Sequence, residues 1–155
     1  MISGKPSVKK TSPTISWRGR RRIPVLLPNK SYTQALIDQR PQLQLQAEGI
    51  EGLPLGGPEN KIWMRAHYYF KNFAHEPDLD NLNSSLLDLM SESGVLGNDR
   101  WVYSTDGSRK HMGSGIEATV VELRPYTDLD EEDELRNAAL GKKRAEEWIS
   151  QYQKA

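Results

Sequence analysis

The stretch Asp78-Leu79-Asp80-Asn81-Leu82 sets two carboxylates two residues apart, directly after an aromatic segment that is typical of a strand. On an extended backbone, residues two apart point to the same face, so Asp78 and Asp80 repel each other unless a cation lies between them. Magnesium suits this position because it takes oxygen ligands, usually one or two carboxylates with waters and substrate phosphates. A helix cap is the alternative interpretation, because Asp is a favoured N-cap residue.

A helix is predicted after this pair, over residues 81–93. Its apolar residues recur at the spacing of one helical face, at Leu82, Leu86, Leu89 and Met90. Gly94 is a stop signal, and a short return segment leads to Asn98 and Asp99 before a predicted strand over 101–105. A loop that doubles back in this way can bring Asp99 near the start of the helix. Three carboxylates would then converge on one point.

These residues resemble the RusA-type Holliday-junction resolvases of bacteria and their phages. The resemblance rests on the D-x-D-N-L stretch, the helix after it, Gly94 and the Asn98-Asp99 pair, and it covers Met64 to Leu123. In that family three aspartates bind magnesium and are needed for cleavage. They correspond here to Asp78, Asp80 and Asp99. The family also has a lysine that is important for activity in the first helical turn, where this chain has Ser84.

The resemblance implies a homodimeric, magnesium-dependent, structure-selective endodeoxyribonuclease, with manganese as a second usable metal. Such an enzyme resolves Holliday junctions and other branched DNA by paired nicks, in recombination and repair. Two alternatives stay open. Ser84 favours a module on the same fold that binds branched DNA without cutting it. The acidic C-terminal segment favours an interaction protein that docks a partner through its last helix.

The chain length of 155 residues predicts one domain with tails. We expect a flexible basic arm over 1–12, a RusA-like nuclease domain over 13–125, and an acidic segment with a C-terminal helix over 126–155. The predicted fold class is α/β (α+β): a small mixed sheet with helices packed on it. The absence of cysteine and of any long apolar run predicts a cytoplasmic protein with no membrane partner.

The charge is strongly asymmetric, although the formal net charge is +0. No acidic residue precedes Asp38, whereas residues 128–134 are almost all acidic. Phosphate contact is the functional interpretation of the basic residues and a solvated surface is the alternative. The residues predicted to bind the DNA backbone are Arg20, Arg21, Arg22, Lys30, Arg109 and Lys110.

Residues 62–73 form the clearest predicted strand, with large side chains on both faces, as expected of a strand that is covered on both sides. Strands over 101–105 and 115–123 flank a polar loop, 106–114, which is either a hairpin tip or a basic loop beside DNA. His67 is interpreted as a sheet histidine. His75 is interpreted as a loop histidine, with a ligand role as the alternative.

The N-terminal half predicts a strand at 14–17, an extended segment at 24–28, and a helix from Ser31 that Pro41 interrupts or kinks. A glycine- and proline-rich loop follows over 48–60. The C-terminal helix carries an apolar stripe at Leu135, Ala138, Ala139, Ala145, Trp148, Ile149 and Tyr152. This stripe predicts packing on the domain or on a partner subunit. The sharper alternative is an acidic segment that imitates DNA and covers the basic surface.

Overall fold

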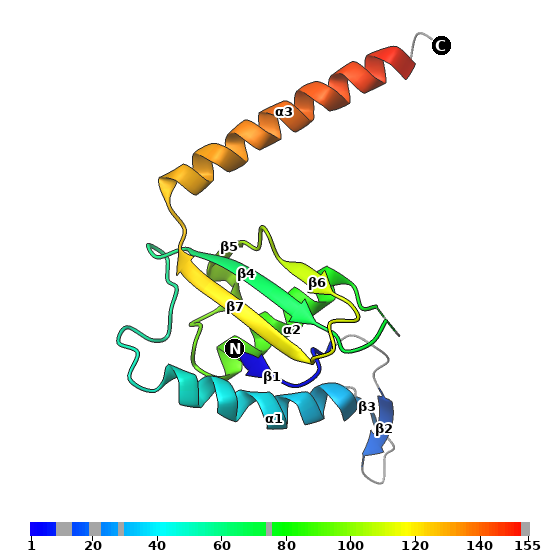
Figure 1. Ribbon diagram of the computed structural model, residues 1–155, viewed down its shortest axis with the longest axis vertical. Helices are drawn as coiled ribbons and strands as arrows, with labels where there is room; N and C mark the ends of the chain where they lie inside the picture. Colours follow the sequence, from blue (N-terminus) through cyan, green and yellow to red (C-terminus); the bar gives the residue numbers. More distant parts are fainter. Residues whose placement is uncertain (9–13, 19–22, 28–29, 74–75, 153–155) are drawn as a thin grey trace.

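The computed structural model describes residues 1–8, 14–18, 23–27, 30–73 and 76–152. Within these ranges the chain forms a five-stranded mixed sheet, a separate two-stranded hairpin and three helices, which confirms the predicted fold class (Figure 1). The elements in chain order are β1 (Ile2–Ser3), β2 (Thr14–Arg18), β3 (Ile23–Leu27), α1 (Lys30–Ala47), β4 (Ile62–Tyr69), α2 (Leu79–Glu92), the 3-10 turn η1 (Asp99–Trp101), β5 (Val102–Ser104), β6 (Arg109–His111), β7 (Ala118–Pro125) and α3 (Asp128–Tyr152).

β4 lies at the centre of the sheet, because both of its edges are paired. On one edge β7 runs antiparallel to it along its whole length. Two short strands share the other edge and run parallel to β4, with β5 near Ile62 and β6 near Tyr69. Between them the hydroxyl of Ser108 accepts the N–H of Ala66 at 3.0 Å, so the edge stays hydrogen-bonded where the two ladders meet.

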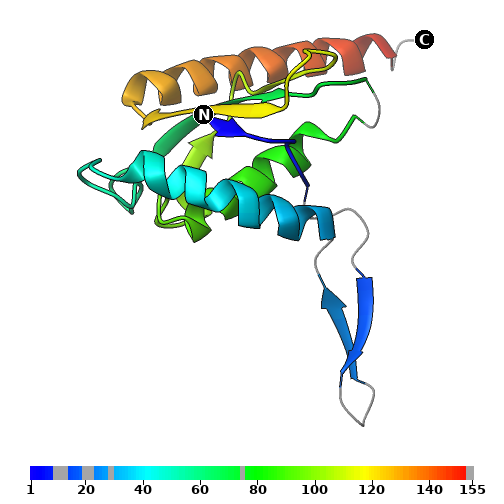
Figure 2. The ribbon, with the colours of Figure 1, turned by 60° about the horizontal axis from the view of Figure 1, so that its bottom comes forward.

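Alternation along β4 gives the sheet a buried face and an open face. The side chains of Met64, Ala66 and Tyr68 are buried, and α1 and α2 lie on their side of the sheet (Figure 2). The side chains between them are half-exposed or exposed. β4 is therefore covered on one side, and the prediction of cover on both sides is wrong. The open face includes Trp63, Arg65, His67, Tyr69, Arg109, His111, Val120, Glu122 and Arg124.

The core forms where α1 and α2 meet the buried face. Its largest fully buried side chains are Tyr68, Ile2, Met64, Leu82, Met90 and Leu96. The hydroxyl of Tyr68 donates to Oδ1 of Asn83 at 2.8 Å, so a buried hydrogen bond joins β4 to α2. Because Asn83 lies one turn into α2, this bond fixes the start of the helix against the sheet.

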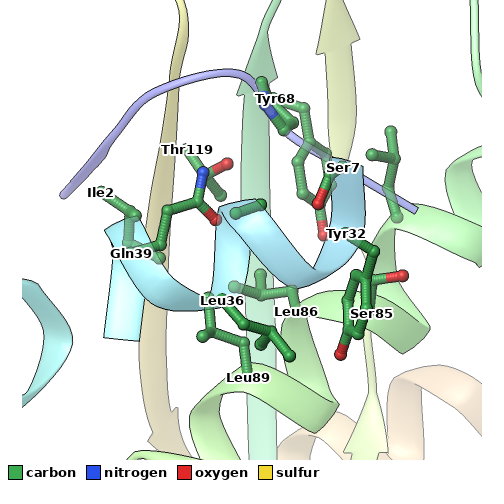
Figure 3. Close-up of a pocket in the computed structure, with 13 residues that line it drawn as sticks. Ile2, Ser7, Tyr32, Leu36, Gln39, Tyr68, Ser85, Leu86, Leu89 and Thr119 are labelled. Atoms are coloured by element: carbon green, nitrogen blue, oxygen red, sulfur yellow. The ribbon is translucent and has the colours of Figure 1, made fainter. Parts of the chain in front are cut away.

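A small cavity of about 20 Å³ marks the seam between the two helices and the N-terminal strand (Figure 3). Tyr32 and Leu36 of α1 line it from one side, and Leu86 and Leu89 of α2 line it from the other. Its volume is enough for about one water molecule. The cavity is therefore a feature of helix packing and not a ligand site.

The N-terminus begins as a strand instead of the flexible basic arm predicted for residues 1–12. Ile2 is 0% exposed and lies in the core, and β1 pairs with the edge of β7. The side chain of Gln42 on α1 accepts the N–H of Ser3 at 2.8 Å and donates to its carbonyl at 3.1 Å. These contacts tie down residues 1–3, and residues 9–12 lie outside the described part of the chain.

Two further predictions need correction. The polar loop 106–114 is not a hairpin tip, because its residues Arg109–His111 form β6 beside the central strand. Of the two effects predicted for Pro41, interruption or a kink, the interruption does not occur: α1 runs from Lys30 to Ala47 with Pro41 inside it and exposed. A proline there removes one helical hydrogen bond, and the contacts of α1 with β1 and α2 maintain the helix on both sides of it.

Two elements extend from the body of the domain. β2 and β3 form an antiparallel hairpin with Arg18 opposite Ile23, and among the described strands they pair only with each other. Figure 2 shows this hairpin near the N-terminal end of α1, projecting from the rest of the domain. α3 continues from the end of β7 and extends away from the sheet (Figure 1). None of the helices in the described ranges combines the length and the apolar character that a membrane crossing requires.

Candidate nucleic-acid and metal site

The paired aspartates lie where α2 begins. Asp78 occupies the N-cap position with an extended backbone (φ −64°, ψ 139°), and Asp80 is in the first turn. Both side chains are exposed. The helix starts at Leu79, earlier than predicted, so the two carboxylates do not share one extended segment. They are neighbours at a helix start.

The carboxylate of Asp78 does not act as the helix cap. The backbone carbonyl of Asp78 accepts the N–H of Leu82 at 3.1 Å, but its side chain makes no capping hydrogen bond. Instead its Oδ2 accepts the side-chain amide of Asn81 at 3.3 Å. A cap position and a metal-binding carboxylate are therefore compatible here, because the cap geometry does not use the carboxylate oxygens.

The helix start also favours negative charge. The N-terminal end of an α-helix carries a partial positive charge and unpaired N–H groups, which stabilise carboxylates and phosphate oxygens nearby. Asp80 lies in the first turn of α2, where this effect is strongest. The start of α2 can thus hold two acidic side chains and still accept a phosphate group beside them.

Lys110 is a cation that contacts the segment just before this start. It lies on β6 opposite Tyr68, and its side chain points to the helix-covered side of the sheet, away from the open face. Its Nζ donates to the carbonyl of Pro77 at 3.0 Å and lies 2.6 Å from Oε1 of Glu76. The lysine side chain is 22% exposed. The residue just before Asp78 is therefore held by a half-buried ammonium group.

Asp99 lies at the other end of the sheet. It begins η1, which Asn98 caps by accepting the N–H of Arg100 at 3.1 Å, and β5 then pairs with β4 near Ile62. Asp78 instead follows the end of β4 near Tyr69, next to β6. Helix α2 spans the gap, and its 14 residues are about 21 Å long.

The expectation that Asp99 returns to Asp78 and Asp80 within one chain is therefore wrong. β4 and β5 are parallel, so the chain must cross the full length of the sheet between them. In agreement, the described part of the chain contains no group of three His, Cys, Asp or Glu side chains placed to hold a metal ion. One chain offers two of the three predicted ligands at one place.

Two carboxylates still fit magnesium. Magnesium keeps several waters and is commonly held by one or two carboxylates together with substrate phosphates. Asp78 and Asp80 are exposed and supply only oxygen ligands, which suit magnesium or manganese better than zinc. The chemistry of the donors thus agrees with the predicted cofactor.

The predicted DNA-binding residues fall at separate places. Lys30 is exposed at the first residue of α1, and Arg109 is exposed on the open face. Lys110 lies beside Pro77 on the other side of β6, as described above. Arg20, Arg21, Arg22 and the histidine at 75 lie outside the described residues. The hairpin strands on either side of the arginine run are described, and they place Arg18 opposite Ile23.

The open face carries features that the sequence reasoning missed. The guanidinium group of Arg124 lies 4.2 Å from the ring centre of Trp63, and that of Arg65 lies 5.3 Å from it. Both arginines are also paired with carboxylates: Arg65 with Glu122, and Arg124 with Asp130. The alternation of residues 62–69 indicated which side chains of this strand share a face. It could not indicate their partners on the neighbouring strands, because these depend on the register of strand pairing.

Two histidines and a tyrosine stack beside this group. Nδ1 of His67 lies 2.9 Å from Nε2 of His111, and the ring of Tyr69 is stacked on His111 at 4.6 Å between centroids. Desolvation lowers the pKa of His67, and the neighbouring His111 lowers it further. His67 is thus a hydrogen-bonded sheet histidine, as predicted.

Comparison with known proteins adds no relative to this description. No family model matches the chain, and no curated protein matches it. The assignment of a function therefore depends on the residues and their geometry.

Proposed function

We propose that this protein is a magnesium-dependent endodeoxyribonuclease that nicks branched DNA such as Holliday junctions, in recombination and repair. The observation that carries the proposal is the start of α2. There Asp78 and Asp80 are exposed, the carboxylate of Asp78 is not used as a cap, and Lys110 is held against the preceding residue. Two carboxylates and one cation at a helix N-terminus suit a phosphodiester that is about to be hydrolysed.

Asp78 and Asp80 are the metal ligands in this proposal, and Asp99 of a second copy completes the set. Within one chain Asp99 is too far away, because α2 separates the two ends of the sheet. In a two-fold dimer, a contact from one copy to the other is always matched by the reverse contact. One such contact would create two identical sites. Two sites per dimer account for the paired nicks that resolve a junction.

Magnesium, when bound, lowers the pKa of a water ligand and offsets negative charge on the phosphate. The residues of the chain have separate tasks around it. Asp78 and Asp80 would hold the ion, and the N-terminal N–H groups of α2 would stabilise negative charge on a phosphate bound beside them. Asn81 holds the carboxylate of Asp78 through its side-chain amide, which limits the orientations that the ligand can take.

Lys110 takes the role of the lysine that the resemblance predicts at Ser84. Its ammonium group lies beside Pro77, so it can stabilise charge that develops on the phosphate in the transition state. The ion pair with Glu76 keeps the lysine in place. A lysine at position 84 of α2 is then not needed, because Lys110 on β6 supplies the positive charge.

DNA backbone contacts would come from Lys30, Arg109 and the arginine run at residues 20–22. Such contacts give affinity without sequence information and weaken as salt rises.

A single observation favours a second function, a module that binds branched DNA without cutting it. Ser84 is half-exposed on α2 at the position of the family lysine. If Lys110 does not replace that lysine, the protein binds branched DNA without cutting it.

A nicking assay on a synthetic four-way junction tests the proposal, with binding measured on the same substrate. Wild-type protein should nick with magnesium and not with chelator present. Asp80→Asn should lose orders of magnitude in nicking rate while it still binds the junction, because it removes a ligand charge and keeps the shape. The matched control is Asp106→Asn, an exposed aspartate in a turn before β6, which should nick at the normal rate. Normal nicking by Asp80→Asn contradicts the proposed site.

A further inference from the structure

α3 is a helix without cover along its described length. It has 25 residues, and every described side chain from 131 to 146 is exposed. Large apolar side chains are exposed too: Leu129, in the first turn, is 73% exposed and Leu135 is 66% exposed. Helices of this kind are marginal in water on their own, because most helical stability in proteins comes from packing. Within the described residues, no other part of the chain covers the side chains of α3 from 131 to 146.

The start of α3 is fixed to the sheet. Asp130 accepts two hydrogen bonds from the guanidinium group of Arg124, at 2.7 and 2.8 Å, and two from Thr127, both at 2.8 Å. These bonds hold the pKa of Asp130 well below its usual range. The hydroxyl of Tyr126 donates to Glu134 at 2.8 Å. The direction in which α3 leaves the domain is thus set by specific contacts, and the helix projects as an arm (Figure 1).

Two blocks of opposite sign lie along this arm, with Arg136 between them and Glu146 and Glu147 after the second. Glu131, Glu132 and Asp133 form an exposed acidic block near the start, and Lys142, Lys143 and Arg144 form an exposed basic block further on. The two blocks are about 16 Å apart along the helix axis. A parallel pair of such helices would place like charges together, whereas an antiparallel pair places each acidic block beside a basic one.

We propose that two copies of this chain associate through α3, as an antiparallel helix pair centred near Ala138. At this register Glu132 lies opposite Arg144 of the second copy, and the two-fold axis repeats the match at the other end. Leu135, Ala138 and Ala145 share one side of the helix at spacings of three and seven residues and form the apolar seam. The inference gives the proposed homodimer a surface, and its test requires no nuclease activity.

The open sheet face is the rival occupant of the α3 surface, and its charges argue against it. Arg65 and Arg124 lie on that face, and both already have carboxylate partners. The other cations on that side are two separate residues and not a block: Lys61, whose Nζ lies 4.4 Å from the ring centre of Tyr103, and Arg109 at the far end of β4. A second copy of α3 offers three exposed cations in a row, of which Lys142 lies 3.9 Å from Glu146 of its own helix.

Charge exchange tests the pairing in the full-length protein. One variant carries Lys142→Glu, Lys143→Glu and Arg144→Glu, and the other carries Glu131→Lys, Glu132→Lys and Asp133→Lys. Sedimentation should show that the wild type is a dimer and that each variant alone has a dissociation constant at least about tenfold higher. A mixture of the two variants should form a dimer again, because the blocks match in the mixed pair.

Cysteine cross-linking tests the direction and register, and the chain has no native cysteine to interfere. Ala138→Cys lies near the proposed axis and should form an intermolecular disulfide under mild oxidation. Ala145→Cys should not, because the two copies of that residue are about 21 Å apart in the antiparallel pair and a disulfide needs its Cα atoms within about 7 Å. A monomeric wild type, charge variants that remain dimers, or a disulfide at Ala145 but none at Ala138 overturns the proposal.

Discussion

Replacing Lys110 by methionine removes an ammonium group that contacts the segment before the candidate site and keeps most of the side-chain volume. Lys110 is half-buried, with its Nζ 3.0 Å from the carbonyl of Pro77 and 2.6 Å from Glu76. Its charge therefore acts on the segment that holds Asp78. If this ammonium stabilises the transition state, its loss should slow phosphodiester cleavage without abolishing junction binding.

The size of the effect follows from Coulomb's law. A unit cation about 6 Å from a unit of developing negative charge, in an effective dielectric constant of about 20, contributes about 2.8 kcal/mol. That energy corresponds to a rate change of about 100-fold. It lies at the lower end of the range of about 100- to 1,000-fold found when one such contact is removed. Glu76 offsets part of the charge, so we expect a loss of between about 10-fold and 100-fold.

Single-turnover cleavage of a labelled four-way junction measures this rate directly. Lys71→Met is the control for the loss of one positive charge, since Lys71 is exposed and follows the end of β4. Adding Ser84→Lys to Lys110→Met should restore most of the lost rate, because α2 then supplies the cation. In the wild-type background Ser84→Lys should change little. Cleavage by Lys110→Met at the rate of an active wild type would refute the role of this lysine.

Two further predictions concern the sheet that supports the site. Tyr68→Phe should lower the free energy of unfolding by about 1–3 kcal/mol in urea denaturation, because the buried Oδ1 of Asn83 loses its donor; an unchanged midpoint would show that this bond does not stabilise the joint between β4 and α2. The lowered pKa of His67 means that below its ordinary value of 6.5 the unfolded chain binds more protons than the folded one, so stability should fall as the pH drops from 7 to 5. His67→Gln should flatten that dependence in melting curves recorded across this range, and an equally steep curve would assign it to other groups.

Local patterns predicted the elements that position the site. The apolar spacing after Asn81 and the stop at Gly94 predicted α2, and Gly94 does have the positive φ of 77° that ends a helix in this way. The same kind of pattern predicted β4, β7 and the long C-terminal helix. The mixed sheet with helices on it followed from these elements together. Helical and strand periods report on the residues within one element, which is why these predictions are confirmed.

Relations between elements could not be predicted in the same way. The pairing direction of β5 with β4 decides where Asp99 lies, and periodicity contains no information on direction. β6 is too short and too polar to show a strand pattern, so neither the pairing of Arg109–His111 nor the contact of Lys110 with Pro77 was visible. Ile2 is buried as part of a strand of only two residues, and so short a strand shows no alternation of apolar and polar residues in the sequence. These contacts arise only when distant segments meet.

A mixed dimer of two inactive variants tests the central claim most directly. The two proteins, Asp80→Asn and Asp99→Asn, are co-expressed with different affinity tags and purified so that only mixed dimers remain. If each site combines Asp78 and Asp80 of one copy with Asp99 of the other, the mixed dimer contains one intact site and one doubly defective site. It should nick one strand of a four-way junction with magnesium, at about half the wild-type number of sites, while each variant alone does not cut. A mixed dimer as inactive as its parents, beside an active wild type, would contradict the shared site.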